Sequence, residues 1–176
     1  MIRKILTTYA TRLEEYLSRF HNQPEELATV GQIGNSTEEK PNKMVVCLLN
    51  VERETTGGIA APVQRTEEGY ARMQPPLLLN LNVMLSTVFD ERQYAESLSL
   101  LTDTLRFIQS VPRFEVDGAW YTIEIINLTL QDLNNMWTLL GGQYYPSVAC
   151  KIRRLCIDGE QAVAGGTTAN RPVVEM

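Results

Sequence analysis

The pattern of apolar and polar positions predicts two long amphipathic helices. Apolar side chains recur at steps of three and four residues from Ile2 to Phe20, and this helix should end just before Pro24. A second helix should follow Asp90, whose carboxylate makes a good N-cap, and should end at Pro112. Its apolar stripe has steps of 4, 3, 4 and 3 residues and consists of Tyr94, Leu98, Leu101, Leu105 and Ile108.

A third, shorter helix is predicted near residue 130. Thr129 and Asp132 form a pair that resembles a capping box, and Gly141-Gly142 supplies a C-cap. The apolar set of this helix is Leu130, Leu133, Met136, Trp137 and Leu140. The segment is therefore a compact helix with start and stop signals at both ends.

Strands are predicted between the helices. Residues 44–51 form a short apolar run rich in strand formers, and residues 77–89 alternate with period two. Asp117-Gly118 is a tight hairpin signal between the runs 113–116 and 119–128. Residues 147–158 are the last predicted strand.

This order of elements predicts one α+β domain over residues 1–158, with a mixed sheet and helices mainly on one of its faces. Residues 22–43 and 52–75 are expected to be long connections that could serve as arms. The tail, residues 159–176, is rich in Gly, Ala and Thr and is expected to be flexible.

Composition changes this outline little, but it narrows the function classes. The net charge of −5 argues against a protein that binds duplex DNA, and apolar runs are too short for a membrane-spanning helix. The N-terminal segment does not resemble a signal peptide. Three scattered cysteines fit a reducing compartment better than a disulfide framework. We therefore expect a cytoplasmic chain without membrane insertion or nucleic acid.

No constellation indicates catalysis, a metal or a cofactor. His21 is the only histidine and is interpreted as a residue at a helix C-terminus, where its charge favours the helix dipole. Cys150 and Cys156 are too far apart along a strand to chelate one metal. The pairs of adjacent acidic residues are interpreted as parts of the solvated surface. Neither Gly57-Gly58 nor Gly141-Gly142 fits the sequence pattern of a phosphate-binding loop. The sequence therefore predicts no catalytic, metal or cofactor residue, and no enzyme.

Positive charge in the last predicted strand is the first candidate for binding. Lys151 and Arg153 should share one face of this strand, and Arg154 should point to the other face. Two interpretations remain open. The strand is either an edge protected by charge or a surface that pairs with an acidic neighbour.

A polar set around the third helix is the second candidate. Tyrosines beside a glycine turn are enriched at protein interfaces when they are exposed, although ordinary turn chemistry explains the same pattern. The candidate interface residues here are Asn134, Asn135, Gln143, Tyr144 and Tyr145.

Several blocks of the sequence resemble one known family. The most specific covers residues 126–148 and contains Asn134-Asn135, Trp137, Gly141-Gly142 and the run Pro146-Ser147-Val148. Weaker blocks cover residues 75–83, 46–52 and the closing Lys-Ile-Arg at 151–153. Over roughly residues 1–160 the chain resembles the cap, or tail-terminator, family of phage-tail-like contractile injection systems.

The resemblance implies a structural role. Members of this family form a six-membered ring on the distal end of the inner tube, stop tube growth and join the last sheath layer. It implies a homo-hexamer whose partners are the tube and sheath proteins, in a particle that is released or membrane-anchored, and no cofactor. A baseplate or tube-adaptor subunit of such a particle is the alternative, and a small enzyme with an unrecognised site is a third reading. Sheath subunits share strands, so residues 147–158 are the candidate acceptor edge and residues 159–176 the candidate donated arm.

Overall fold

A computed structural model gives the fold of the chain. It describes residues 1–21, 26–34, 40–54, 63–66, 69–73, 76–158 and 162–167. Contacts divide the chain into two compact units. One comprises residues 1–52 and 80–154, and the other comprises residues 53–79 and 155–176. The predicted α+β class with a mixed sheet is confirmed, whereas the predicted domain boundary at residue 158 stays a prediction.

The larger sheet has six strands in the order β1-β2-β5-β8-β7-β6. Strand β1 pairs in parallel with β2, whereas β6 with β7 and β7 with β8 are antiparallel. Their bounds are Ala28–Val30 (β1), Lys43–Arg53 (β2), Leu77–Val88 (β5), Arg113–Val116 (β6), Ala119–Ile125 (β7) and Ser147–Ile157 (β8). All the strands predicted from the sequence are present, and β1 is an addition inside the expected connection 22–43.

The turn between β6 and β7 has the predicted hairpin chemistry. Asp117 has a φ of 53° and Gly118 a φ of 78°, so both central residues adopt the left-handed conformation of a type I′ turn. This turn sets the register that pairs Phe114 with Tyr121.

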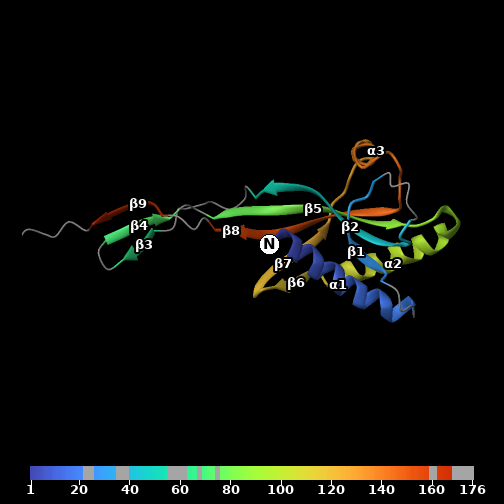
Figure 1. Cartoon of the computed structure of the whole chain (residues 1–176), viewed down its shortest axis with the longest axis horizontal. Helices are drawn as coiled ribbons and strands as arrows, with labels where there is room; N and C mark the ends of the chain where they lie inside the picture. Colours follow the sequence, from blue (N-terminus) through green and yellow to red (C-terminus); the bar gives the residue numbers. More distant parts are fainter. Residues whose placement is uncertain are drawn as a thin grey trace, which may run out of the picture. The chain divides into compact units, whose positions relative to one another are not determined.

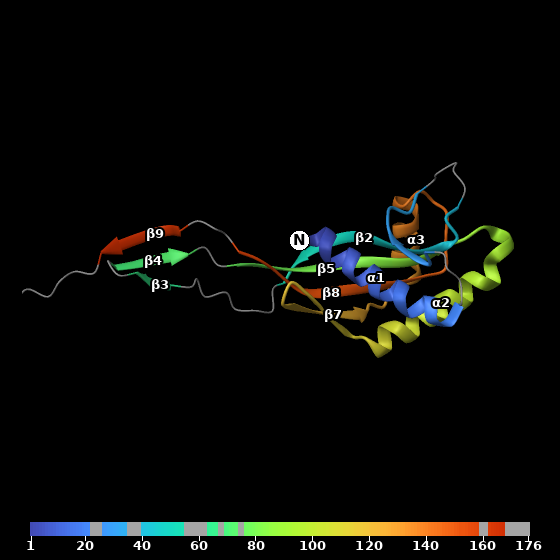
Figure 2. The same ribbon diagram turned by 60° about the horizontal axis from the view of Figure 1, so that its bottom comes forward.

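Helix α1 (Ile2–His21) and helix α2 (Tyr94–Ser110) cover one face of this sheet, as Figures 1 and 2 show. The stripe predicted for α1 is the side that faces the sheet, because Ile5, Tyr9, Leu13 and Leu17 are fully buried. The Tyr9 ring lies 5.6 Å from that of Phe107 and 5.1 Å from that of Phe114, so aromatic contacts join the two helices to the sheet.

Helix α2 does not bury the apolar stripe from which the helix was predicted. A short 3₁₀ turn, Glu91–Gln93, precedes the helix, and the Asp90 side chain caps this turn instead. The inward side of α2 carries the polar residues Ser97, Asp103 and Thr104 beside Leu100, Phe107 and Ile108. Of the predicted stripe, Ile108 is buried, whereas Tyr94, Leu98 and Leu105 are exposed.

Hydrogen bonds explain how α2 buries polar side chains. The Ser97 hydroxyl donates to the Tyr94 carbonyl at 2.7 Å, and the Thr104 hydroxyl donates to the Leu100 carbonyl at 2.9 Å. A buried hydroxyl that bonds the preceding helical turn costs little, because its donor is satisfied without an external partner. The polar side of α2 can therefore face the core.

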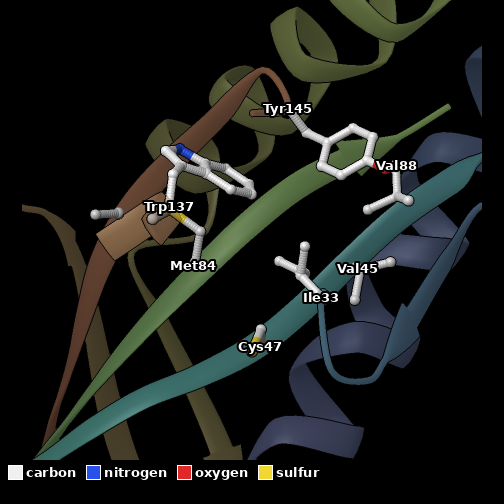
Figure 3. Packing of buried hydrophobic residues seen from close by; sticks show 8 residues of the cluster. Ile33, Val45, Cys47, Met84, Val88, Trp137 and Tyr145 are labelled. Carbon is white, nitrogen blue, oxygen red and sulfur yellow. The ribbon is translucent and has the colours of Figure 1, made fainter. Parts of the chain in front are cut away.

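Helix α3 (Leu130–Leu139) covers part of the opposite face of the sheet (Figure 1). Trp137 is its only buried residue, and it packs in a cluster with Val45 and Cys47 of β2 and Met84 of β5 (Figure 3). The central strands are therefore apolar on both faces, as Met44, Val46, Leu81 and Leu85 are also fully buried.

The second unit contains a separate sheet of three strands in the order β3-β4-β9. Strand β4 (Gly69–Met73) pairs antiparallel with both β3 (Val63–Thr66) and β9 (Ala162–Thr167). The predicted connection 52–75 and the predicted flexible tail thus each contribute strands, which the sequence reading missed. The rest of the tail lies outside the described residues.

The two tryptophans offer a matched test of the packing of Trp137 with Val45, Cys47 and Met84, which we call the α3 cluster. Trp137 is 4% exposed and Trp120 is 55% exposed. Trp137→Ala should lower the free energy of unfolding by about 3–5 kcal/mol, because it leaves a cavity under α3. Trp120→Ala should cost less than about 1 kcal/mol. Chemical denaturation of both variants measures the difference, and equal losses would contradict the packing described here.

Candidate assembly interface

Helix α3 presents a polar surface, and capping hydrogen bonds fix both ends of the helix. The Thr129 hydroxyl accepts from the Asp132 amide at 3.1 Å, and the Asp132 carboxylate accepts from the Thr129 amide at 3.3 Å, so the predicted capping box is confirmed. The Gly142 amide closes the helix by donating to the Trp137 carbonyl at 2.7 Å. Asn134 and Asn135 are exposed between these caps.

Of the two tyrosines that follow α3, one lies at the surface and the other lies in the core. Tyr144 is 57% exposed and meets the edge of Trp137, with ring centroids 5.6 Å apart. Tyr145 is 6% exposed and packs 5.8 Å from Trp137 in the α3 cluster (Figure 3). The interpretation of Tyr145 as an exposed interface residue is therefore wrong. Gln143 is half-buried.

Lys151 and Arg153, two of the three charged residues of β8, are paired within the chain. Lys151 Nζ lies 2.9 Å from a carboxylate oxygen of Glu52 on β2. Arg153 Nε donates at 2.8 Å to Glu124 on β7, the strand that pairs with β8. These contacts give Lys151 and Arg153 acidic partners on other strands of the same sheet, which the sequence did not reveal.

Strand β8 is not an edge. It lies between β5 and β7 in the sheet, and its residues 150–153 pair with β7. The interpretation as a charge-protected edge and the proposal of β8 as an acceptor for an added strand are both wrong. The edge strands of the larger sheet are β1 and β6, and those of the smaller sheet are β3 and β9.

Arg154 interrupts the alternation of β8. Its φ of 77° is in the left-handed region, which costs energy for a residue with a side chain. Cys150, Ile152 and Leu155 are fully buried, whereas Arg154 is exposed, so the inward positions shift by one residue. Simple alternation would put Arg154 on the face opposite Lys151 and Arg153, together with the buried Cys150 and Ile152, but Leu155 takes that inward position instead.

The three thiols are held in their neutral form. Burial raises the pKa of Cys150 to about 12 and also raises the pKa of Cys47. Burial, and then the nearby Asp158 carboxylate, raise the pKa of Cys156. A raised pKa suppresses the thiolate that nucleophilic and metal-binding cysteines need. Within the part of the chain that the structure describes, no group of three or more His, Cys, Asp or Glu side chains could hold a metal ion.

His21 has a partner that the sequence did not reveal. Its Nε2 lies 2.9 Å from a carboxylate oxygen of Asp103, whose other oxygen accepts from Arg106 at 2.7 Å. Asp103 is only 7% exposed, so these two contacts supply the partners that a buried carboxylate requires. The histidine thus ties the end of α1 to the middle of α2.

None of the helices in the ranges given above is long and apolar enough to span a membrane.

The Glu52 pair predicts a specific response to acid. Lys151, followed by Asn82, lowers the pKa of Glu52 by hydrogen bonding, so its stabilising effect is present above the unfolded pKa of about 4.3 and is lost as pH falls through the lower folded value. Glu52→Gln should lose up to about 1 kcal/mol at pH 7 and match the parent at the lowest pH. Glu96→Gln, an exposed change on α2, is the control. Thermal unfolding from pH 3 to 7 tests this, and a pH-independent difference would contradict it.

Comparison with solved structures identifies relatives of this fold. The sheath/tube terminator of PVC, an extracellular contractile injection system, in its extended state matches with a TM-score of 0.63 and 12% identity over 98% of this chain. The tube-terminating cap of the anti-feeding prophage matches with a TM-score of 0.63 and 11% identity over 96% of this chain. The chain covers 63% and 60% of the lengths of those two proteins. No curated protein sequence matches it.

The family assignment rests on the amino-acid sequence. The family model described as the Pvc16 N-terminal domain matches residues 4–171, which is nearly the whole chain. This range includes both compact units and the α3 cluster with its candidate interface residues. The chain therefore belongs to the Pvc16 N-terminal domain family.

Proposed function

We propose that this protein is the cap of a contractile injection system, which ends the inner tube and joins it to the last sheath layer. The observation that carries the proposal is the fold, shared over 98% of the chain with a sheath/tube terminator. Membership of the Pvc16 N-terminal domain family supports the same role. The role is structural and requires no catalytic residue or cofactor.

The cap acts as a ring of six identical subunits that assembles on the tube in the cytoplasm. A ring needs a heterologous contact, in which two different patches of each subunit meet. Tube and sheath then contact the remaining surfaces of the ring. The particle that carries the cap is afterwards released or held at the membrane.

The candidate contact residues are those that remain exposed or half-buried in the subunit: Asn134, Asn135, Gln143, Tyr144, Lys151, Arg153 and Arg154. The neutral amides of α3 suit the interior of an interface, from which charged residues are depleted. A strand shared with a sheath subunit would pair at an open edge, which β6 offers in the larger sheet and β3 or β9 in the smaller one.

The length of the particle tests the proposed role. Deletion of the gene should give tubes of variable and excessive length, because nothing stops the addition of tube subunits, and sheaths that detach from their distal end. Electron microscopy of purified particles measures both, and complementation with the intact gene is the control. Uniform, fully sheathed particles in the deletion strain would contradict the proposal, as would a label on this chain that appears beside the spike.

A charge swap separates the internal role of Lys151 from a contact with a neighbour. Lys151→Glu places two carboxylates together and should cost about 1 kcal/mol of stability, because the Glu52 pair is partly exposed. The swap of Glu52→Lys with Lys151→Glu restores the internal pair and should recover most of that loss. We expect the swapped protein to fold but to incorporate poorly into particles, as judged by immunoblot. Normal incorporation would show that Lys151 serves only the fold.

A further inference from the structure

Arg154 has a backbone conformation that is unusual for its residue type and for its place in the chain. Its φ of 77° lies in the left-handed region, inside strand β8. The other described residues with a positive φ lie outside the helices and strands, and their types are the ones most often found in this region: Asn42, Asp117, Gly118, Gly141 and Gly142. A left-handed residue inside a strand is typical of one kind of β-bulge, in which glycine occupies the position.

The fold explains the conformation of residue 154 but not its side chain. The left-handed residue lets Leu155 face inward, and both Ile152 and Leu155 are fully buried. Glycine would give the strand the same path without the close contact that a Cβ atom makes with the backbone in this region. Arginine therefore carries a strain that glycine would avoid, and the packing of β8 gives no reason for it.

The guanidinium of Arg154 has no partner in the part of the chain that the structure describes. The residue is exposed, and no carboxylate or carbonyl among the described residues accepts a hydrogen bond from it. The next carboxylate along the chain belongs to Asp158, and four residues of extended chain span about 13 Å. That carboxylate accepts from the Cys156 thiol. The five donors of the guanidinium are therefore free to bind a group outside this part of the chain.

Arg154 also leaves one positive charge of β8 unmatched. Lys151 pairs with Glu52, and Arg153 pairs with Glu124, so the other two basic side chains of this strand have carboxylates within the chain. Of these five side chains, three carry a positive charge and two carry a negative charge. The excess charge attracts an anion, and a guanidinium can bind both oxygens of a carboxylate through two parallel hydrogen bonds.

We propose that Arg154 is an assembly contact whose guanidinium binds an aspartate or glutamate side chain of a neighbouring protein subunit in the particle. Strained backbone is concentrated at binding and active sites, and a bulge re-aims a side chain out of the regular alternation of a strand. Here the strained residue is a long, exposed cation without a partner among the described residues. The inference rests on the proposed function and deepens it, because it names the chemistry of one contact with the partner.

The strain at Arg154 allows a test in which lost binding is distinguished from lost folding. Arg154→Gly removes the side chain together with the strain, whereas Arg154→Ala removes the guanidinium and keeps a Cβ atom in the left-handed region. The melting temperature of Arg154→Gly should therefore lie about 2–4 °C above that of Arg154→Ala. Both variants should be incorporated into particles at least about tenfold less than the parent, because the carboxylate of the partner loses its cation.

Immunoblots of purified particles measure incorporation, and thermal unfolding of the isolated chains measures stability. Arg3→Gln removes an exposed positive charge from α1 and should be incorporated normally, which controls for the change in net charge. Normal incorporation of Arg154→Gly would overturn the proposal. A loss confined to Arg154→Ala would overturn it as well, because strain and not the missing guanidinium would then explain the defect.

Crosslinking provides a second measurement and identifies the partner. The chain has four lysines, Lys4, Lys40, Lys43 and Lys151, so Arg154→Lys adds one primary amine at a known position. In intact particles, a water-soluble carbodiimide should join this amine to a carboxylate of another subunit, and the parent chain should lack that crosslink. Peptide mass spectrometry then shows whether the carboxylate belongs to a second copy of this chain, to the tube or to the sheath. Incorporation of the variant without such a crosslink would contradict the proposal.

The outcomes separate this contact from the proposed function. If deletion of the gene alters particle length but Arg154→Gly is incorporated normally, the contact is wrong and the cap role stands. If deletion leaves particle length unchanged while Arg154→Gly is lost from particles and the crosslink forms, the contact stands and the cap role fails. Altered length together with the loss and the crosslink supports both.

Discussion

The fold depends on covering both faces of the strands β2, β5 and β8. Met44 and Val46 on one face and Val45 and Cys47 on the other are all nearly inaccessible, so this part of the sheet cannot leave either face in water. Helices α1 and α2 cover the first face with a broad apolar surface. Among the described residues, the second face is covered by the short α3, by Tyr145 and by Ile33, which follows β1. Trp137 therefore carries a large share of the packing from a helix that buries no other residue.

Local elements could be predicted from the sequence because their signals are local. The capping box at Thr129, the hairpin turn at Asp117-Gly118 and the apolar side of α1 depend on residues within a few positions of each other. The orientation of α2 could not be predicted in this way. Periodicity finds the stripe with the most apolar residues, whereas the structure buries the side on which Ser97 and Thr104 bond their own helix and Asp103 meets His21.

The candidate interface residues show the same difference between local signals, which the sequence contains, and contacts between distant residues, which it does not reveal. Lys151 and Arg153 suggested a free basic surface, but Glu52 and Glu124 reach them from strands far away in the sequence, and alternation within one strand contains no information about such partners. The block that resembles the cap family, residues 126–148, holds Trp137 and Tyr145 as core residues. Much of what makes this block recognisable is thus the packing of α3 on the sheet, and a smaller part of it is exposed surface.

The position of β8 has a consequence for synthesis of the chain. It is the last of the six strands in sequence, yet it lies between β5 and β7, so the sheet stays split until residues 147–157 leave the ribosome. Strand β9 likewise pairs with β4 across about ninety residues of chain. Contacts this distant in sequence slow folding, because loop closure precedes any gain from pairing. A nascent chain therefore exposes the unpaired backbone edge and the apolar side chains of β5 during translation, and folding to the native sheet follows translation of β8.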